Sequence, residues 1–174
     1  MDVLWAPWRM EYVGASGKPG GCIFCELPAL PPAERRGGLV LAAGPDTAVL
    51  LNRYPFNNGH LLVVPRRHVA WLEELGPADA AALDGALRDA VALVRVVLAP
   101  DGLNVGMNLG EAAGAGIAGH LHWHVVPRWS GDVNFMPVVA ESKVMPEHLM
   151  TTYDRLRAGL TAIEARATAG RGSS

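Results

Sequence analysis

Apolar positions in the chain recur most regularly between Pro77 and Ala99, where they predict a long helix. Proline suits the first position of a helix, and Pro100 would end it. The helical spacing is carried by Leu83, Leu87, Val91, Val94 and Leu98. A second helical pattern covers residues 146–166. Its apolar side consists of Leu149, Tyr153, Leu156 and Leu160.

Short apolar runs between turn-forming residues predict the strands. We expect strands at LVLAAG, TAVLLN, HLLVVP, LNVGMNLG and HLHWHVVP. Helices and strands do not alternate regularly, which favours an α+β domain with a mainly antiparallel sheet. The predicted organisation is an N-terminal arm at residues 1–20, one domain at residues 21–165 and a disordered tail at residues 166–174.

Composition adds limits to this picture. The chain has 174 residues, of which 50% are hydrophobic, so one domain can bury a sizeable core. A net charge of -2 argues against a protein that coats nucleic acid or an anionic membrane, but one nucleotide can still bind. We expect no transmembrane helix and no signal peptide, and hence a cytoplasmic protein.

The most informative segment is Gly-His-Leu-His-Trp-His-Val-Val-Pro. Side chains alternate faces along a strand, so His120, His122 and His124 share one face, roughly 7 Å apart from one to the next. A polar row without chemistry would not need three imidazoles. Three interpretations stay open: a solvent-facing polar row without chemistry, a zinc site built from His-x-His, and nucleophilic catalysis by a histidine.

Nucleophilic catalysis is the favoured interpretation. Neutral imidazole can attack phosphorus and later leave, which divides one hard displacement into two easier ones. The central His122 is then the nucleophile, since it has an imidazole on either side. His120 could orient it, and His124 could position the phosphate or help deliver a proton to the leaving group.

A glycine-rich loop, Asn108 to Gly119, leads into the row. Glycines let the backbone approach a ligand and expose N–H groups to an anion, so we expect nucleotide binding there. The glycines assigned to this role are Gly110, Gly114 and Gly116. The two cysteines, Cys22 and Cys25, are spaced C-x-x-C, which in a reducing compartment favours metal or redox use.

The chain resembles the histidine triad superfamily. His120-Leu-His-Trp-His-Val-Val fits the family's signature of three histidines separated by hydrophobic residues. Asn52-Arg-Tyr-Pro-Phe-Asn-Asn-Gly-His60 looks like the family's ribose-binding turn. The similarity covers roughly residues 5 to 160, and Glu-Ser-Lys-Val-Met-Pro146 is most similar to the bacterial diadenosine tetraphosphate phosphorylase- or hydrolase-like branch.

The resemblance implies a five-stranded, mainly antiparallel sheet with one long and one C-terminal helix, usually assembled as a homodimer. It implies catalysis by His122 with support from its neighbours and from His60. It also implies ribose contact by Asn52 and contact of Asn108 with the phosphate or the leaving group. The expected activity is hydrolysis or transfer of nucleotidyl groups from dinucleoside polyphosphates or nucleoside phosphoramidates.

The resemblance extends to a metal. Related uridylyltransferases and several bacterial histidine triad proteins hold a structural zinc, which here would be bound by Cys22, Cys25, His68 and His120. The chemistry itself would require no cofactor. Two alternatives stay open: a zinc-dependent hydrolase whose histidine row holds the catalytic metal, and a non-catalytic nucleotide-binding module.

In the N-terminal arm, Trp5 and Trp8 are candidate anchors of a dimer interface.

Overall fold

A computed structural model describes residues 21–132 and 145–171 of the chain, with side chains as far as residue 165. The predicted N-terminal arm, with Trp5 and Trp8, lies outside the described residues. The elements in chain order are α2 (Ile23–Glu26), η2 (Leu27–Ala29), β1 (Val40–Ala43), β2 (Thr47–Leu51), β3 (Leu61–Pro65), η3 (Leu72–Glu74), α3 (Pro77–Leu98), β4 (Gly102–Gly106), η4 (Glu111–Ala113), β5 (Trp123–Arg128) and α5 (Leu149–Arg171).

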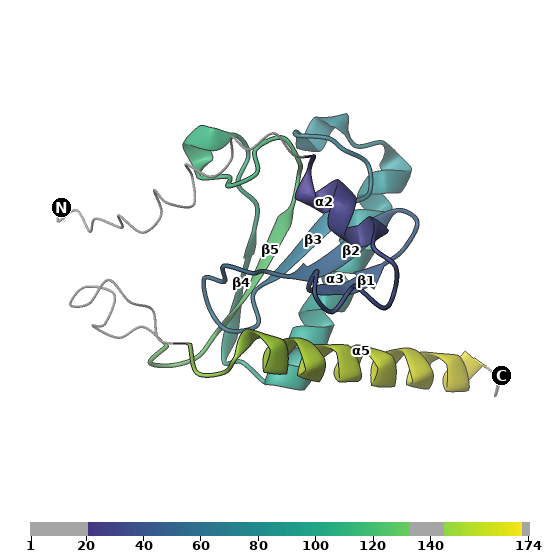
Figure 1. Ribbon diagram of the computed structural model, residues 1–174, viewed down its shortest axis with the longest axis vertical. Coiled ribbons are helices and arrows are strands. Elements are labelled where there is room, and N and C mark those ends of the chain that lie inside the picture. Colours follow the sequence, from purple (N-terminus) through teal and green to yellow (C-terminus); the bar gives the residue numbers. More distant parts are fainter. Residues whose placement is uncertain (1–20, 133–144, 172–174) are drawn as a thin grey trace.

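The five strands form one sheet in the order β1-β2-β3-β5-β4, and every neighbouring pair is antiparallel (Figure 1). The predicted α+β fold with a five-stranded antiparallel sheet is therefore confirmed. Strand β3 is central, and all five of its residues are buried, because both faces of the sheet are covered. This explains its continuous apolar sequence, which lacks the alternation of a half-exposed strand.

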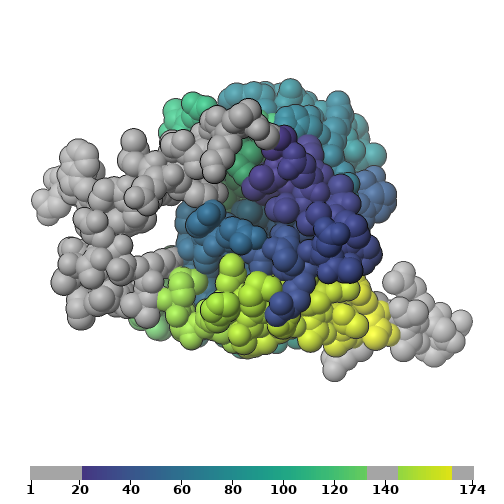
Figure 2. Space-filling view, viewed as in Figure 1, coloured from purple at the N-terminus to yellow at the C-terminus, as the bar shows by residue number. Residues whose placement is uncertain are grey.

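The two faces of the sheet carry separate clusters of apolar side chains. Leu61 and Val63 pack in the larger cluster with α3 and α5. Leu62 and Val64 point to the other face and pack with Phe24 of α2. Figure 2 shows the purple segment that contains α2 above the yellow-green helix α5. The face covered by α2 is the one that carries the histidines.

The helices differ from their predicted bounds at the ends. Helix α3 stops at Leu98, because Ala99 adopts a left-handed conformation with φ of 46° directly before the predicted terminator Pro100. Helix α5 begins at Leu149 and continues to Arg171. Residues 166–171, which we had expected in a disordered tail, are therefore helical, and residues 172–174 lie outside the described residues.

Two buried hydrogen bonds attach α5 to the parts of the fold that lead into the histidine site. The Tyr153 hydroxyl donates to the Val40 carbonyl of β1 at 2.9 Å. The Thr152 hydroxyl donates to the Asn58 side chain at 3.0 Å, in the turn before β3. The C-terminal helix therefore supports both an edge strand and this turn. Among the described residues, no helix combines the length and apolar character needed to cross a membrane.

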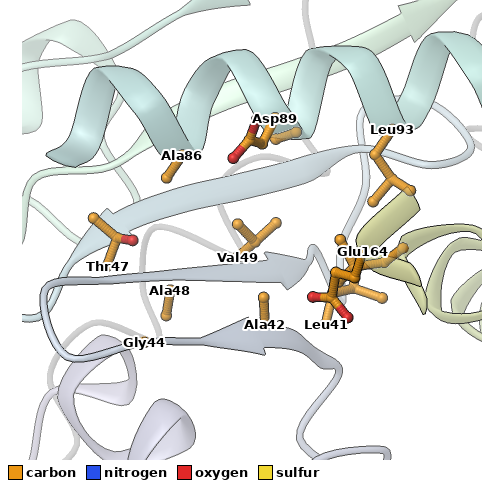
Figure 3. Close-up of a pocket in the computed structure, with 12 residues that line it drawn as sticks. Leu41, Ala42, Gly44, Thr47, Ala48, Val49, Ala86, Asp89, Leu93 and Glu164 are labelled. Carbon is orange, nitrogen blue, oxygen red and sulfur yellow. The ribbon is translucent and has the colours of Figure 1, made fainter. Parts of the chain in front are cut away.

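A pocket of about 170 Å³ opens on the face covered by α3 and α5. Figure 3 shows it between β1, β2 and α3, with Asp89 on the α3 side and Glu164 of α5 at the right. Its lining is mostly small and apolar and includes none of the histidines. The candidate site described below therefore lies elsewhere.

Candidate active site

Three histidines line up on the α2 face of the sheet. His124 lies in β5 opposite Leu62 of β3, and His120 and His122 precede the strand. The rings of His122 and His124 make a T-shaped contact, with centroids 4.9 Å apart. Leu121 is buried in the cluster on the other face, as the predicted alternation requires.

The strand predicted for this segment begins too early, because β5 starts only after His122. The reason is that the side chain of His120, and not a backbone N–H, bonds the last carbonyl of β3. His120 Nε2 donates to the carbonyl oxygen of Pro65, the last residue of β3, at 3.0 Å. The Leu121 N–H therefore pairs beyond that strand, with the Val69 carbonyl at 2.7 Å.

The contacts of His122 determine which of its nitrogens is free to react. Nδ1 lies 2.8 Å from the main-chain oxygen of His120. A carbonyl oxygen can only accept, so Nδ1 carries the proton and Nε2 keeps a lone pair. Burial lowers the pKa of His122 below its ordinary value of 6.5, and the ring is therefore neutral at pH 7. His122 thus offers a neutral nitrogen nucleophile.

His60 and His124 are joined by a hydrogen bond between their rings. The Phe56 N–H and the Asn52 side-chain amide lie 3.0 Å and 3.2 Å from His60 Nδ1, so Nδ1 accepts and Nε2 carries the proton. His60 Nε2 lies 2.9 Å from His124 Nδ1, which must accept. The remaining proton of His124 is therefore on Nε2.

That Nε2 atom of His124 is buried and has no hydrogen-bond partner among the described residues. Burial lowers the pKa of His124 to about 4, and the neighbouring His122 adds to this effect, so the ring stays neutral at pH 7. An unsatisfied buried donor costs about 1–3 kcal/mol. An oxygen of a bound phosphate would satisfy it, which makes this N–H a candidate ligand contact.

Asn52 supports the same pair from the turn after β2. Its Oδ1 accepts the Tyr54 N–H at 3.0 Å, which leaves the amide nitrogen facing His60. The side chain is buried, but Oδ1 keeps a second lone pair and the amide a second N–H. The ribose contact of Asn52 stays a prediction.

Four predicted metal ligands converge beside the row although they are far apart in the sequence. The ligand atoms of Cys22, Cys25, His68 and His120 all lie within 4.8 Å of one another. The two sulfurs lie 3.2 Å and 3.6 Å from His120 Nδ1, and Cys25 Sγ lies 3.4 Å from His68 Nδ1. The structure therefore brings this whole set together.

The donor set fits a tetrahedral metal. The Nε2 proton of His120 is committed to Pro65, so Nδ1 turns its lone pair toward the two sulfurs. Thiolate and imidazole ligands around zinc would lie about 3.5 Å apart, close to the spacing found here. Burial and the neighbouring Cys22 raise the pKa of Cys25, so a bound cation would be needed to hold Cys25 as a thiolate.

The glycine-rich loop leads directly into the row. Gly110 and Gly114 adopt left-handed conformations, with φ of 78° and 85°, that disfavour any side chain. The Asn108 amide donates to the Gly114 carbonyl at 3.4 Å, and the Ile117 carbonyl accepts the His120 N–H at 3.3 Å. The loop thus contains all the residues predicted to contact phosphate: Asn108, Gly110, Gly114 and Gly116.

Two phenylalanines belong to the site but were not predicted. Phe24 of α2 packs on His122 with ring centroids 5.0 Å apart. Phe56 stacks on His124 with centroids 5.6 Å apart and an interplanar angle of 25°. A single aromatic residue in a short helix or a turn has no periodicity to reveal it. The available signals were that Phe24 lies between the two cysteines and that Phe56 lies in the turn that resembles a ribose-binding segment.

A salt bridge holds the turn that carries His60. Arg128 donates both Nε and Nη2 to the Asp132 carboxylate, at 2.7 Å and 2.8 Å. Asp132 also accepts from the Asn57 side chain at 2.7 Å and from the Trp129 N–H at 3.1 Å. The Arg128 guanidinium lowers the pKa of Asp132 to about 2. The ionised carboxylate is therefore the form that holds the turn.

We expect Asp132→Asn to lower the free energy of unfolding by about 1–3 kcal/mol at pH 6, since the charge-assisted hydrogen bonds are lost. A depressed carboxyl pKa stabilises the fold above pH about 4, and this contribution is lost as the pH falls toward 2. In urea unfolding, the difference in free energy of unfolding between the variant and wild type should become smaller as the pH falls from 4.5 to 2.5. Asp84→Asn, which breaks an exposed ion pair on α3, serves as the control and should differ little from wild type. A pH-independent loss in Asp132→Asn would contradict the assignment.

The three aligned histidines define a histidine-triad site, and comparison of the chain with protein-family models leads to the same class. The family model described as the HIT domain matches residues 38–131, more than half of the chain. The chain therefore belongs to the HIT domain family. It is 43% identical over 158 residues to the AP-4-A phosphorylase of Mycobacterium tuberculosis, an alignment that covers 86% of this chain and 79% of that protein.

Other relatives are more distant. The bis(5'-nucleosyl)-tetraphosphatase [asymmetrical] of Schizosaccharomyces pombe is 31% identical over 86 residues, which cover 49% of this chain and 47% of that protein. A crystal structure of a Zn-bound histidine triad family protein from Mycobacterium smegmatis has a TM-score of 0.64 at 26% identity. That match covers 84% of this chain and 97% of the other. These similarities support both the fold and the class of site.

Proposed function

We propose that the chain is a nucleotidyl hydrolase or transferase that cleaves dinucleoside polyphosphates of the diadenosine tetraphosphate type, or nucleoside phosphoramidates, through a nucleotidyl-histidine at His122. The observation that carries this proposal is the hydrogen bond from His122 Nδ1 to the His120 carbonyl. It leaves Nε2 unprotonated inside a row of neutral histidines. The similarity to an AP-4-A phosphorylase supports the choice of substrate.

In the first step the Nε2 lone pair of His122 forms a bond to the α-phosphorus. The bond from phosphorus to the leaving oxygen breaks, and diadenosine tetraphosphate releases ATP with that electron pair. In the second step water or inorganic phosphate attacks the nucleotidyl-histidine, and the bond from phosphorus to Nε2 breaks. Water then yields AMP and phosphate yields ADP, while His122 returns to its neutral form.

The surrounding residues provide donors for the developing charge. His124 directs its unsatisfied Nε2–H at a phosphate oxygen. The loop from Asn108 to Gly116 supplies backbone N–H groups other than those of residues 113–115, which donate within the loop. Asn52 holds the ribose through its spare donor and acceptor positions. His60 keeps the proton of His124 on the nitrogen that faces the phosphate.

We also propose that Cys22, Cys25, His68 and His120 hold a structural zinc. When bound, the ion would neutralise the two thiolates and fix the segment that contains α2 against the entry to β5. His120 would then belong to both sites: its side chain binds the metal, and its carbonyl orients His122. The chemistry at phosphorus needs no metal in this scheme.

The partners that we propose are a small nucleotide and a second copy of the chain, rather than nucleic acid or a membrane. A net charge of -2 gives little attraction to polyanions. An edge strand that exposes Val105 of β4 offers one surface for self-association. A cytoplasmic location suits two cysteines that remain unpaired thiols.

Incubation with diadenosine tetraphosphate, with and without inorganic phosphate, tests the proposal through its products. ADP and ATP that appear only with phosphate would identify a phosphorylase. AMP and ATP without phosphate would identify a hydrolase. Adenosine 5'-phosphoramidate is tested in parallel as the second substrate class. Tight binding of these nucleotides with no turnover and no adduct would overturn the proposal and leave a non-catalytic binding module.

A further inference from the structure

Phe56 is the one aromatic ring that contacts both members of the His60–His124 pair among the described residues. Its ring centroid lies 4.8 Å from that of His60 and 5.6 Å from that of His124. Its own N–H donates to His60 Nδ1 at 3.0 Å. The ring is 45% exposed, so it forms an outer cover on the pair and is not part of the buried core.

The same residue therefore contacts the pair in two ways. The N–H helps fix the proton of His60 on Nε2, which in turn fixes the proton of His124 on Nε2. The ring packs on both imidazoles, tilted by 33° against His60 and stacked on His124 at 25°. Because the ring packs on both imidazoles, we expect it to limit the access of water to their 2.9 Å hydrogen bond.

We infer that Phe56 is a positioning residue whose ring holds His60 and His124 in register, so that His124 keeps an Nε2–H directed at the phosphate. This inference rests on the proposed function. It assigns the ring no contact with substrate. Loss of the ring should therefore act through His124, on the rate of the chemical step, and leave nucleotide binding nearly unchanged.

The kinetic test compares Phe56→Ala and Phe56→Tyr with wild type, using the substrate that the product analysis identifies. Removing one oriented donor costs about 10²–10³ in kcat, so the loss of its support should cost less, about 10-fold in Phe56→Ala. KM should change by less than about 2-fold. Phe56→Tyr keeps the aromatic face and should restore kcat. In a His124→Ala background, Phe56→Ala should cause no further loss, because the two residues act as one unit.

A second measurement does not depend on turnover. The proton shared between His60 and His124 should give a slowly exchanging imidazole N–H resonance in the NMR spectra of wild type and Phe56→Tyr. In Phe56→Ala, water reaches this hydrogen bond, and the resonance should be lost or exchange much faster. Circular dichroism and thermal unfolding first establish that each variant is folded.

Several results would overturn the inference. They are an unchanged kcat in folded Phe56→Ala, a loss confined to KM, losses that add to those of His124→Ala, or an unchanged N–H resonance. Failure of the proposed function gives a different result. Wild type would then turn over none of the substrates, while the NMR comparison would still decide the role of Phe56.

Discussion

Replacing His122 by alanine is expected to lower turnover of diadenosine tetraphosphate by at least about 10⁴-fold, and to abolish the covalent intermediate. The size of the effect follows from the loss of the nitrogen that the proposed mechanism bonds to phosphorus, and comparable losses accompany removal of other nucleophiles. Nucleotide binding should persist, because the proposed phosphate and ribose contacts remain. Rapid quenching at alkaline pH followed by mass spectrometry would detect the nucleotidyl adduct on wild type.

His148→Ala is the matched control for this substitution. His148 is an exposed histidine directly before α5, where its Nδ1 accepts the Met150 N–H. Its replacement should leave both turnover and adduct at the level of wild type. An adduct mapped to a residue other than His122, or full activity in His122→Ala, would refute the mechanism.

The second large effect, a loss of bound zinc and a lower Tm, is expected when both cysteines are changed to serine. Wild type should carry about one zinc per chain, and Cys22→Ser/Cys25→Ser should carry none. A ligand present at 1,000 times its dissociation constant stabilises a fold by about 4 kcal/mol, which corresponds to roughly 8–16 °C in Tm for a chain of this size. Elemental analysis and calorimetry measure both quantities, and His148→Ala should match wild type in zinc content.

The activity of the same cysteine variant distinguishes a structural zinc from a catalytic one. If zinc is structural, the variant should still form the His122 adduct at a temperature where it remains folded. A zinc-dependent hydrolase would lose all turnover while folded. The geometry favours the structural role, because only His120 of the row belongs to the group of convergent ligands found among the described residues. His122 and His124 direct their nitrogens elsewhere.

Much of the fold could be predicted from local patterns. The apolar spacing in α3 and the uninterrupted run in β3 each reflect burial against neighbours that the chain itself supplies. The three histidines were found for the same reason, since a period of two along an extended segment places them on one face. Assignment to the HIT domain family then brought in residues that no periodicity marks, such as His68.

What could not be predicted depends on contacts between distant parts of the chain. The bond from His120 to Pro65 shortens β5, and neither residue alone signals it. The protonation of His60 follows from the N–H of Phe56 in a turn whose shape the sequence does not specify. Helix α5 continues past residue 165 although its composition resembles a tail. Tautomers and element ends are thus properties of the packed structure.

The proton on His122 is set by a main-chain carbonyl, and every amino acid has one. Residue 120 therefore need not be histidine for residue 122 to keep its nucleophilic nitrogen. In the proposed zinc site, histidine is needed at position 120 because its side chain faces the sulfurs of Cys22 and Cys25. In a lineage that lost both cysteines, residue 120 would keep only the side-chain bond to Pro65, and it should vary more than residue 122. Variation at the first histidine of the row should follow the cysteine pair and not the chemistry at phosphorus.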